Sequence, residues 1–271
     1  MNRVDFAVVI TAQGCNPNGD PLDGNRPRFL YDGRGEMSSV CLKRKVRDYL
    51  AMQGDPILIM PDTVVLQTLK ASASVSAALK SKDVDLAKKA ACKEWFDVRA
   101  FGSLLPFKGS EVSISVRGPV SIGDATSLST IEVIDKCITR VCNFETAGKL
   151  ESSTMGHRYT VMPAVYVAYG GIFPQLASLT GFTDQDAEKI KRALAHMFRY
   201  DAAYARPAGS MTSTLFWWTH PSETGAASPA KVHHSLHVVQ HESYPYFSWT
   251  ADPVDGVNLE VLGENTTPAC V

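Results

Sequence analysis

The chain has 271 residues, of which 45% are hydrophobic and 20% are charged, and its formal net charge is −1. These values predict one large domain, or one domain with large insertions, that can bury a sizeable core. They exclude a uniformly polycationic protein, and no apolar run approaches the roughly 18 residues that a membrane-spanning helix needs.

Neither the N-terminal residues nor the cysteines indicate secretion. The apolar run Phe6–Ala12 is short, follows Asp5 and lacks a signal-peptide cleavage pattern. The cysteines form no C-x-x-C pair and have no metal-ligand spacing; they stand at positions 15, 41, 92, 137, 142 and 270. We therefore expect reduced thiols and a cytoplasmic protein with no metal or other cofactor.

Charge is distributed unevenly along the chain. Between Arg26 and Arg47 lie seven basic and two acidic residues, whereas Glu242–Val271 contains five acids and no Lys or Arg. A chain polarised in this way can bind nucleic acid on one face and stay soluble on another.

The N-terminal segment is predicted to run from a strand through a long loop into a cationic helix. Val4–Thr11 is rich in β-formers and indicates a buried strand. Residues 14–37 carry five Gly and three Pro, which predicts a long loop, and such loops are usually functional. Ser38 or Ser39 can cap a helix that runs to about Met52.

On this helix one apolar face is expected to pack inward. Its members are Leu42, Val46, Tyr49 and Leu50. Lys43 and Arg47 lie one turn apart on one shoulder of that face, and Lys45 lies on the other. Arg44 points outward, where it can pair with Asp48.

The rest of the chain is predicted to be mainly strands, with two further helices. One helix is expected near Asp83–Asp97, and another opens at Thr183 with Asp186 in a capping-box-like position. Asn143–Gly156 is polar and predicts a protruding loop or hairpin tip. The predicted strands are Glu111–Val116, Ile131–Val141, Tyr159–Tyr169, Thr212–Trp218, Val232–Gln240 and Tyr246–Thr250. This order indicates an α+β fold with an antiparallel sheet, preferably a split βαβ unit with insertions.

The order of strand, glycine-rich turn and cationic helix suits the binding of a polyanion. Backbone N–H groups of the turn and the charges of the helix can both contact phosphate. The first fifty residues therefore predict an RNA-binding surface.

Several segments together resemble one known family. They are NPNGDP at residues 16–21, GNRPR at 24–28 and CLKRKVRDYL at 41–50. A D-x-R-x-F-G element at residues 97–102, Gly118–Val120 with Ala125 and Ser127, and residues 155–158 and 206–211 add to the likeness. Over roughly residues 4–240 the chain resembles the backbone subunit of type I-C CRISPR surveillance complexes, of the Cas-seven family and RAMP superfamily.

The resemblance implies an RRM-like (ferredoxin-like) palm with a finger insertion and a β-hairpin thumb. The palm would comprise residues 1–53, 112–142 and 160–271, the finger about 54–111, and the thumb about 143–159. It also implies a non-catalytic protein that polymerises along CRISPR RNA and displays the spacer for pairing with target DNA. Its partners would be that RNA, target DNA through the heteroduplex, further copies of itself and the other subunits of the complex, with no membrane contact.

A guide RNA has to be held without its sequence being read, because every spacer differs, so contacts should go to phosphate and 2′-hydroxyl groups. In the loop and helix the expected contacts are Asn16, Asn18, Gly19, Arg28, Lys43, Arg44, Lys45 and Arg47. Arg99 is expected to bind phosphate, and Phe101 and Met155 to form the wedge that unstacks bases. Arg158 and Arg206 complete the set, although the family often has a longer arginine-rich run near Arg206.

Other interpretations remain open for these residues. The basic run can be a solvated helix face, Phe101 can belong to the core, and Arg99 can bind Asp97 or a carbonyl. The histidines His233, His234, His237 and His241 can form a zinc site or be ordinary surface or strand residues. Asp20, Asp23 and Asp32 can hold a divalent ion for RNA cleavage, although Asp20 also suits a turn. A generic single-stranded RNA-binding module is the remaining alternative.

Overall fold

The computed structural model describes residues 1–80, 83–105, 114–139 and 155–268. The helices are α1 (Ser39–Met52), α2 (Val65–Ala71), α3 (Ala73–Lys80), α4 (Val84–Glu94), α5 (Phe96–Phe101), α6 (Pro174–Thr180), α7 (Asp184–His196) and α8 (Pro229–His234). The strands are β1 (Val4–Ala12), β2 (Gly19–Asp20), β3 (Arg26–Pro27), β4 (Arg34–Met37), β5 (Gly102–Leu105), β6 (Ile114–Arg117), β7 (Val120–Ile122), β8 (Ala125–Thr130), β9 (Val133–Thr139), β10 (Met155–Val161), β11 (Ala164–Ile172), β12 (Met211–Thr219), β13 (Leu236–Gln240), β14 (Phe247–Ala251) and β15 (Asn258–Gly263). The mixed α+β class is confirmed.

The central sheet is antiparallel, as predicted. Within the described residues its strand order is β15-β12-β1-β11-β8-β4, with β7 beside β11. Strand β1 lies in the middle: Val4 pairs with Ile172 of β11 and with Thr219 of β12, and the register continues without a break to Ala12. All nine residues of β1 are buried because both faces of the sheet are covered.

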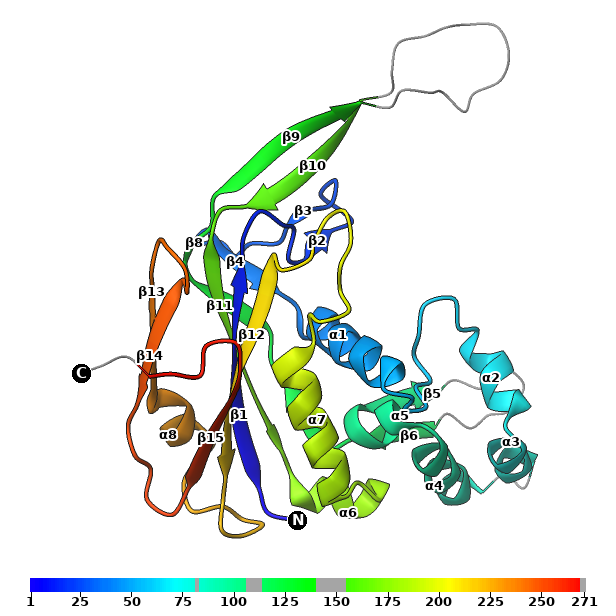
Figure 1. The fold of residues 1–271 in the computed structure, drawn as a ribbon. Coiled ribbons are helices and arrows are strands. Elements are labelled where there is room, and N and C mark those ends of the chain that lie inside the picture. Colours follow the sequence, from blue (N-terminus) through cyan, green and yellow to red (C-terminus); the bar gives the residue numbers. More distant parts are fainter. Residues whose placement is uncertain (81–82, 106–113, 140–154, 269–271) are drawn as a thin grey trace, which may run out of the picture.

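Helices α1 and α7 cover one face of the sheet (Figure 1). Phe6, Val8 and Ile10 point to this side, and the ring of Phe6 stacks on Trp217 at 5.8 Å. Ser38 caps α1, and Thr183 and Asp186 form the expected capping box of α7. The four predicted inward residues of α1 are buried, which confirms the helical pattern.

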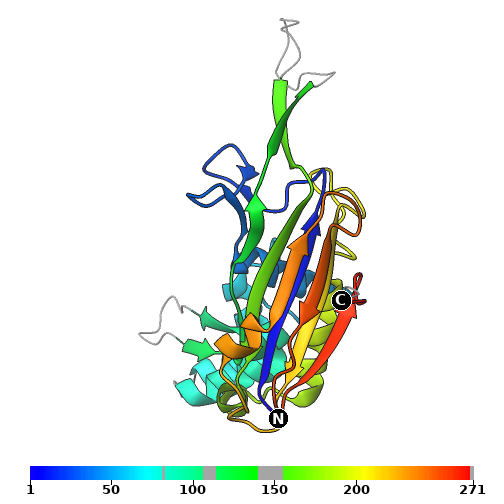
Figure 2. The same cartoon turned by 90° about the vertical axis from the view of Figure 1, so that its left-hand side faces the viewer.

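The opposite face is covered by α8, β13 and β14 (Figures 1 and 2). Trp249 packs edge-on against Phe216 with ring centroids 4.8 Å apart. The predicted strand Val232–Gln240 is wrong in its first half, because Ser228 caps a short helix with Pro229 in its first turn. Only Leu236–Gln240 is a strand.

The described residues between Leu58 and Arg117, which include α2 to β6, form a helical insertion with its own hydrophobic cluster. That cluster includes Leu58, Leu69, Val75 and Trp95. The predicted helix Asp83–Asp97 begins at an Asp83 cap but breaks at Trp95, which is extended and separates α4 from α5. Among the described residues, no helix combines the length and apolar character needed to cross a membrane.

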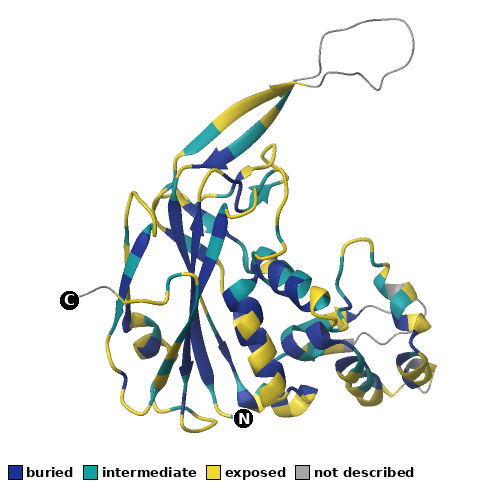
Figure 3. Cartoon of the chain, viewed as in Figure 1, coloured by how far each residue is buried: buried dark blue, intermediate teal, exposed yellow. Residues whose placement is uncertain are grey.

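A β-hairpin made of β9 and β10 projects from the end of the sheet (Figures 1 and 2). Its arms are mostly exposed or half-buried, unlike the strands of the sheet below (Figure 3). The predicted tip falls mostly on residues 140–154, which lie outside the described residues. The predicted loop 14–37 is more ordered than expected, since it contains β2, β3 and β4.

Candidate nucleic-acid interface

Several distant segments meet at the hairpin end of the sheet. Backbone hydrogen bonds join Gln13 to Ser210 (2.9 Å), Gly14 to Val161 (3.0 Å) and Asn16 N–H to the Ala205 carbonyl (2.8 Å). The loop after β1, the end of β10 and residues 201–210 therefore form one continuous surface. We call it the sheet-end surface, and it includes the β2–β3 loop and the base of the hairpin.

The predicted RNA contacts Asn16, Asn18 and Gly19 make hydrogen bonds and close contacts within the loop that carries this surface. Asn16 is buried, and its side-chain amide donates to the Asn25 carbonyl at 2.7 Å. The Asn18 Oδ1 accepts from both the backbone N–H (2.9 Å) and the hydroxyl (3.1 Å) of Ser38, which ties the loop to the α1 cap. A Cβ at Gly19 would lie 2.0 Å from Asn25 Oδ1. These residues support the loop, and their contact with RNA stays a prediction.

Two arginine–tyrosine stacks hold the base of the hairpin. The Arg26 guanidinium lies over the Tyr159 ring at 4.7 Å, and the Arg158 guanidinium lies over the Tyr204 ring at 4.4 Å. Because neighbouring residues of a strand point to opposite faces, Arg158 and Tyr159 fix both faces of β10. Tyr204 is 66% exposed, and the Nε of Arg158 is buried without a hydrogen-bond partner.

The first of these stacks extends further along the hairpin. The His157 ring lies parallel to Tyr159 at 6.0 Å, and its Nδ1 is 2.8 Å from the Asp135 carboxylate. Sequence reasoning missed Arg26, Tyr159, Tyr204 and His157 as part of this surface. The alternation of cation and ring in His157-Arg158-Tyr159 was the available signal.

The cations of α1 are mostly neutralised within the chain. Arg44 pairs with Asp48 at 2.7 Å, as predicted. Lys45 is only 6% exposed and pairs with Asp201, which also accepts from Arg206 Nε at 2.8 Å. Binding of RNA by Lys45 and Arg206 stays a prediction, and the two cations share the one carboxylate of Asp201.

Arg47 is held by a buried carboxylate of the D-x-R-x-F-G element. Asp97 is 1% exposed and accepts from Arg47 Nε (2.9 Å) and from the backbone N–H groups of Leu58 (2.8 Å) and Ile59 (3.1 Å). Asp97 therefore joins α1 to the start of the helical insertion. The partner of Arg47 thus lies on another element, and contact of Arg47 with RNA stays a prediction.

The rest of the D-x-R-x-F-G element also holds neighbouring elements together. Arg99 makes a two-pronged contact with Asp186, at 3.0 and 2.9 Å, and donates to the Cys92 carbonyl at 2.8 Å. The carbonyl alternative is thus confirmed, whereas Asp97 is not the partner of Arg99. Phe101 is half-buried against the main core, 5.1 Å from the Arg47 guanidinium.

The pKa of Asp186 is lowered from its ordinary value. Burial acts to raise that pKa, but hydrogen bonds from Arg99 and Thr183, with the charge of Arg99, outweigh it. The Asp186 carboxylate therefore remains ionised and keeps Arg99 in place.

Two predicted cations, Lys43 and Arg28, are less tightly paired than Lys45 and Arg47. Lys43 has no ion pair among the described residues; its Nζ lies 5.7 Å from the Phe101 ring centroid. Burial and then the charge of Arg47 lower the pKa of Lys43, against an opposing effect of Asp124. Arg28 is 3.5 Å from Asp20, with about a third of its side chain exposed. For Met155, the side chain lies outside the described part of the structure.

The histidines do not share one strand face. His233 and His234 lie on α8, while His237 contacts Asp252 at 3.0 Å and His241 contacts Ser248 at 2.8 Å. In the described ranges, no group of three or more His, Cys, Asp or Glu side chains is arranged to hold a metal.

The comparisons with known proteins identify the family. Residues 2–252 match the family of CRISPR-associated protein Cas7, and the chain therefore belongs to it. A CRISPR-associated protein Cas7 of Haloferax volcanii is 33% identical over 153 residues, covering 49% of this chain and 45% of the relative. The match thus spans less than half of that curated relative.

Two solved structures are similar in part. A chain of a "CRISPR RNA-guided surveillance complex, pre-nicking" has a TM-score of 0.48 at 17% identity, over 80% of this chain and 75% of the other. A chain of a "CRISPR RNA-guided surveillance complex" has a TM-score of 0.44 at 19% identity, over 80% and 69%. The family assignment rests on the match over residues 2–252.

Proposed function

We propose that this protein is a non-catalytic subunit that binds CRISPR RNA and forms the multi-copy backbone of a type I-C surveillance complex. It would present the spacer for pairing with target DNA, and its partners would be the RNA, further copies of itself and the other subunits of the complex. Membership of the Cas7 family supports the class of function. The subtype rests on the resemblance of the NPNGDP, GNRPR and CLKRKVRDYL segments.

The sheet-end surface is the observation that carries this proposal. Arg26 and Arg158 can contact phosphate, and the exposed Tyr204 offers a flat ring on which an unstacked base can rest. Both kinds of contact tolerate any base sequence. A protein that carries many different guides needs this property.

The connectivity supports a palm with a finger and a thumb. The chain order β1–α1–β8–β11–α7–β12, with spatial order β12-β1-β11-β8, is that of a split βαβ (RRM-like) unit. In this proposal the helical insertion is the finger and the hairpin is the thumb. The paired arms are Val133–Thr139 and Met155–Val161, so we assign the thumb a wider range than 143–159.

A metal-dependent ribonuclease is the rival function, and the loop aspartates favour the turn interpretation instead. Asp20 accepts the backbone N–H of Leu22 at 3.0 Å and lies 3.5 Å from Arg28. Asp32 accepts the backbone N–H of Arg34 at 3.0 Å and pairs with its side chain at 2.6 Å. Each carboxylate therefore has a local structural role.

The decisive experiment is purification of the protein from cells that express a CRISPR array, followed by sequencing of the bound RNA. We expect repeat–spacer RNA with many spacers represented, and less of it with the Arg26→Ala/Arg158→Ala variant. Recovery of unrelated cellular RNA would instead indicate a generic RNA-binding module. Incubation with labelled RNA and Mg²⁺ or Mn²⁺ should leave the RNA intact, and cleavage lost in Asp20→Ala would support the ribonuclease.

A further inference from the structure

Asp135 of β9 lies between two side chains at the base of the hairpin that can carry positive charge. One of its carboxylate oxygens is 2.8 Å from His157 Nδ1, and the other is 4.0 Å from the Arg26 guanidinium. Asp135 stands opposite Tyr159 in the register of the hairpin, and both Arg26 and His157 stack on the Tyr159 ring. We call Arg26, Asp135 and His157 the Asp135 group.

Few ionisable side chains surround His157 on this face of the hairpin. Among the described residues, they are Asp135, Cys137, Tyr159 and, beyond the tyrosine ring, Arg26. Lys136 and Arg158 alternate to the other face of the hairpin. Of these described side chains, Asp135 supplies the one carboxylate.

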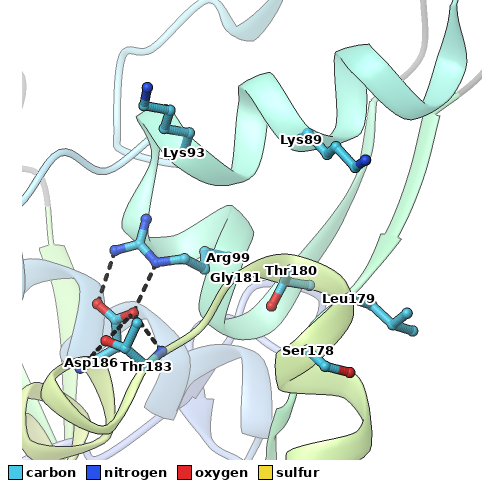
Figure 4. Close-up of a pocket in the computed structure, with 9 residues that line it drawn as sticks. All are labelled: Lys89, Lys93, Arg99, Ser178, Leu179, Thr180, Gly181, Thr183 and Asp186. Atoms are coloured by element: carbon cyan, nitrogen blue, oxygen red, sulfur yellow. Dashed lines mark hydrogen bonds and ion pairs between the residues drawn. The ribbon is translucent and has the colours of Figure 1, made fainter.

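The contacts of Asp135 are weak enough to be exchanged for others. The side chains of the Asp135 group are 42–57% exposed, and exposed ion pairs contribute little because water and salt screen them. The pair of Arg99 with Asp186 is different, since it is two-pronged and mostly buried (Figure 4). A phosphate can therefore replace Asp135 beside Arg26 without the loss of a buried ion pair.

The hydrogen bond to Asp135 determines where His157 takes up a further proton. An ionised carboxylate only accepts hydrogen bonds, so Nδ1 carries the hydrogen of the neutral ring. The second proton then binds to Nε2, which has no hydrogen-bond partner among the described residues. Protonation there keeps the hydrogen bond to Asp135, converts it into an ion pair and adds a free N–H donor.

Protonation of His157 changes the net charge of the Asp135 group by one. With a neutral ring, the charges of Arg26 and Asp135 cancel, and with a charged ring one positive charge remains. The His157 contact is shorter than the Arg26 contact, 2.8 against 4.0 Å, so the charged ring neutralises the carboxylate and leaves Arg26 to phosphate. Histidine side chains change charge between about pH 5 and 8.

We propose that Asp135 is an internal competitor of RNA phosphate at the base of the hairpin, and that protonation of His157 relieves this competition. RNA binding and proton uptake by His157 then favour each other, because the coupling between two binding events is reciprocal. The proposal rests on the proposed function for RNA as the source of the phosphate.

The first test removes the competing charge and keeps the shape of the side chain. Near pH 8, Asp135→Asn should bind labelled single-stranded RNA about fivefold more tightly than the unaltered protein. One added charge contributes about 0.7 to the slope of log K against log salt, which is about fivefold in affinity at about 0.1 M salt. A gain in affinity is not the result expected of a misfolded variant.

Asp252→Asn is the matched control for this change. Asp252 is an exposed carboxylate 3.0 Å from His237, and its backbone N–H binds the Ser235 carbonyl at the end of α8. We expect its RNA affinity to equal that of the unaltered protein. An unchanged or lower affinity in Asp135→Asn would overturn the proposal, because it would show that Asp135 only braces the hairpin.

The second test measures the same RNA affinity between about pH 8 and about pH 5.5. For the unaltered protein we expect a rise of about fivefold on acidification, with a salt slope steeper by about 0.7. His157→Gln should lose this response, whereas His237→Gln, from the exposed pair with Asp252, should keep it. An equal response in the two variants would contradict the role of His157. Thermal unfolding midpoints equal to that of the unaltered protein show that both variants fold.

The competitor role of Asp135 and the proposed function fail in different ways. RNA that binds the unaltered protein, with no gain in Asp135→Asn, counts against the competitor alone. No RNA binding by the unaltered protein at either pH would overturn both.

Discussion

The cationic helix α1 and the base of the hairpin use positive charge in different ways. On α1, Lys45 and Arg47 are bound to the buried or nearly buried carboxylates Asp201 and Asp97. At the hairpin, Arg26 and Arg158 lie on tyrosine rings; Arg26 has one long, exposed ion pair with Asp135 (4.0 Å), and Arg158 has none among the described residues. A dense basic run in a sequence therefore need not be where free charge lies in the fold. We therefore expect substitutions of the paired residues of α1 to lower stability, and substitutions of Arg26 and Arg158 to weaken RNA binding.

The largest effect is expected from Asp97→Ala. This change leaves the Arg47 charge and two backbone N–H groups without their partner, and breaking a buried ion pair from one side costs about 3–5 kcal/mol. Urea unfolding would measure it. Asp48→Ala is the control, because its half-exposed i,i+4 pair with Arg44 is worth at most about 1 kcal/mol. Equal losses of unfolding free energy in the two variants would show that Asp97 does not hold α1 to the helical insertion.

A smaller loss is expected from Lys45→Met. Asp201 keeps Arg206 as a partner in this variant, so we expect a destabilisation of about 1–3 kcal/mol. Lys43→Gln is the matched change on the same helix, and its effect should stay within about 0.5 kcal/mol because Lys43 has no ion pair in the described structure. Thermal unfolding of both variants checks the difference. A larger loss for Lys43→Gln would contradict the account of α1.

Acid titration tests how Arg99 is held, through its partner Asp186. Because the folded pKa of Asp186 lies below its ordinary value, the Asp186 carboxylate adds stability above that value. This contribution should be lost as the pH falls through the lowered folded pKa. Asp186→Asn should therefore be less stable than the unaltered protein at neutral pH, and the two should converge in acid. A difference that persists unchanged in acid would contradict this.

Local sequence signals predicted much of the fold. Ser38 and the spacing of Leu42, Val46 and Leu50 defined α1, and Thr183 with Asp186 defined the start of α7. The helix α8 was missed because the β-branched and apolar residues after it outweighed the Ser228-Pro229 start signal. The strand β15, which pairs with β12, was also missed.

The candidate site was harder to predict, because ion-pair partners are far apart in the chain. Asp97 lies 50 residues from Arg47, Asp186 lies 87 from Arg99, and Asp201 lies 156 from Lys45. Periodicity within one element cannot reveal such partners. For the same reason the sequence did not predict the contact between Arg26 and Tyr159.

The salt dependence of RNA binding tests the central claim most directly. Arg26→Ala/Arg158→Ala should lower the slope of log K against log salt by about 1.4, since each phosphate contact to a single strand contributes about 0.7. The loss of affinity should be the same for two RNAs of unrelated sequence. Arg117→Ala/Arg192→Ala, which removes two exposed arginines from β6 and α7, should change neither quantity. An unchanged slope in Arg26→Ala/Arg158→Ala, or a loss confined to one RNA sequence, would contradict the account.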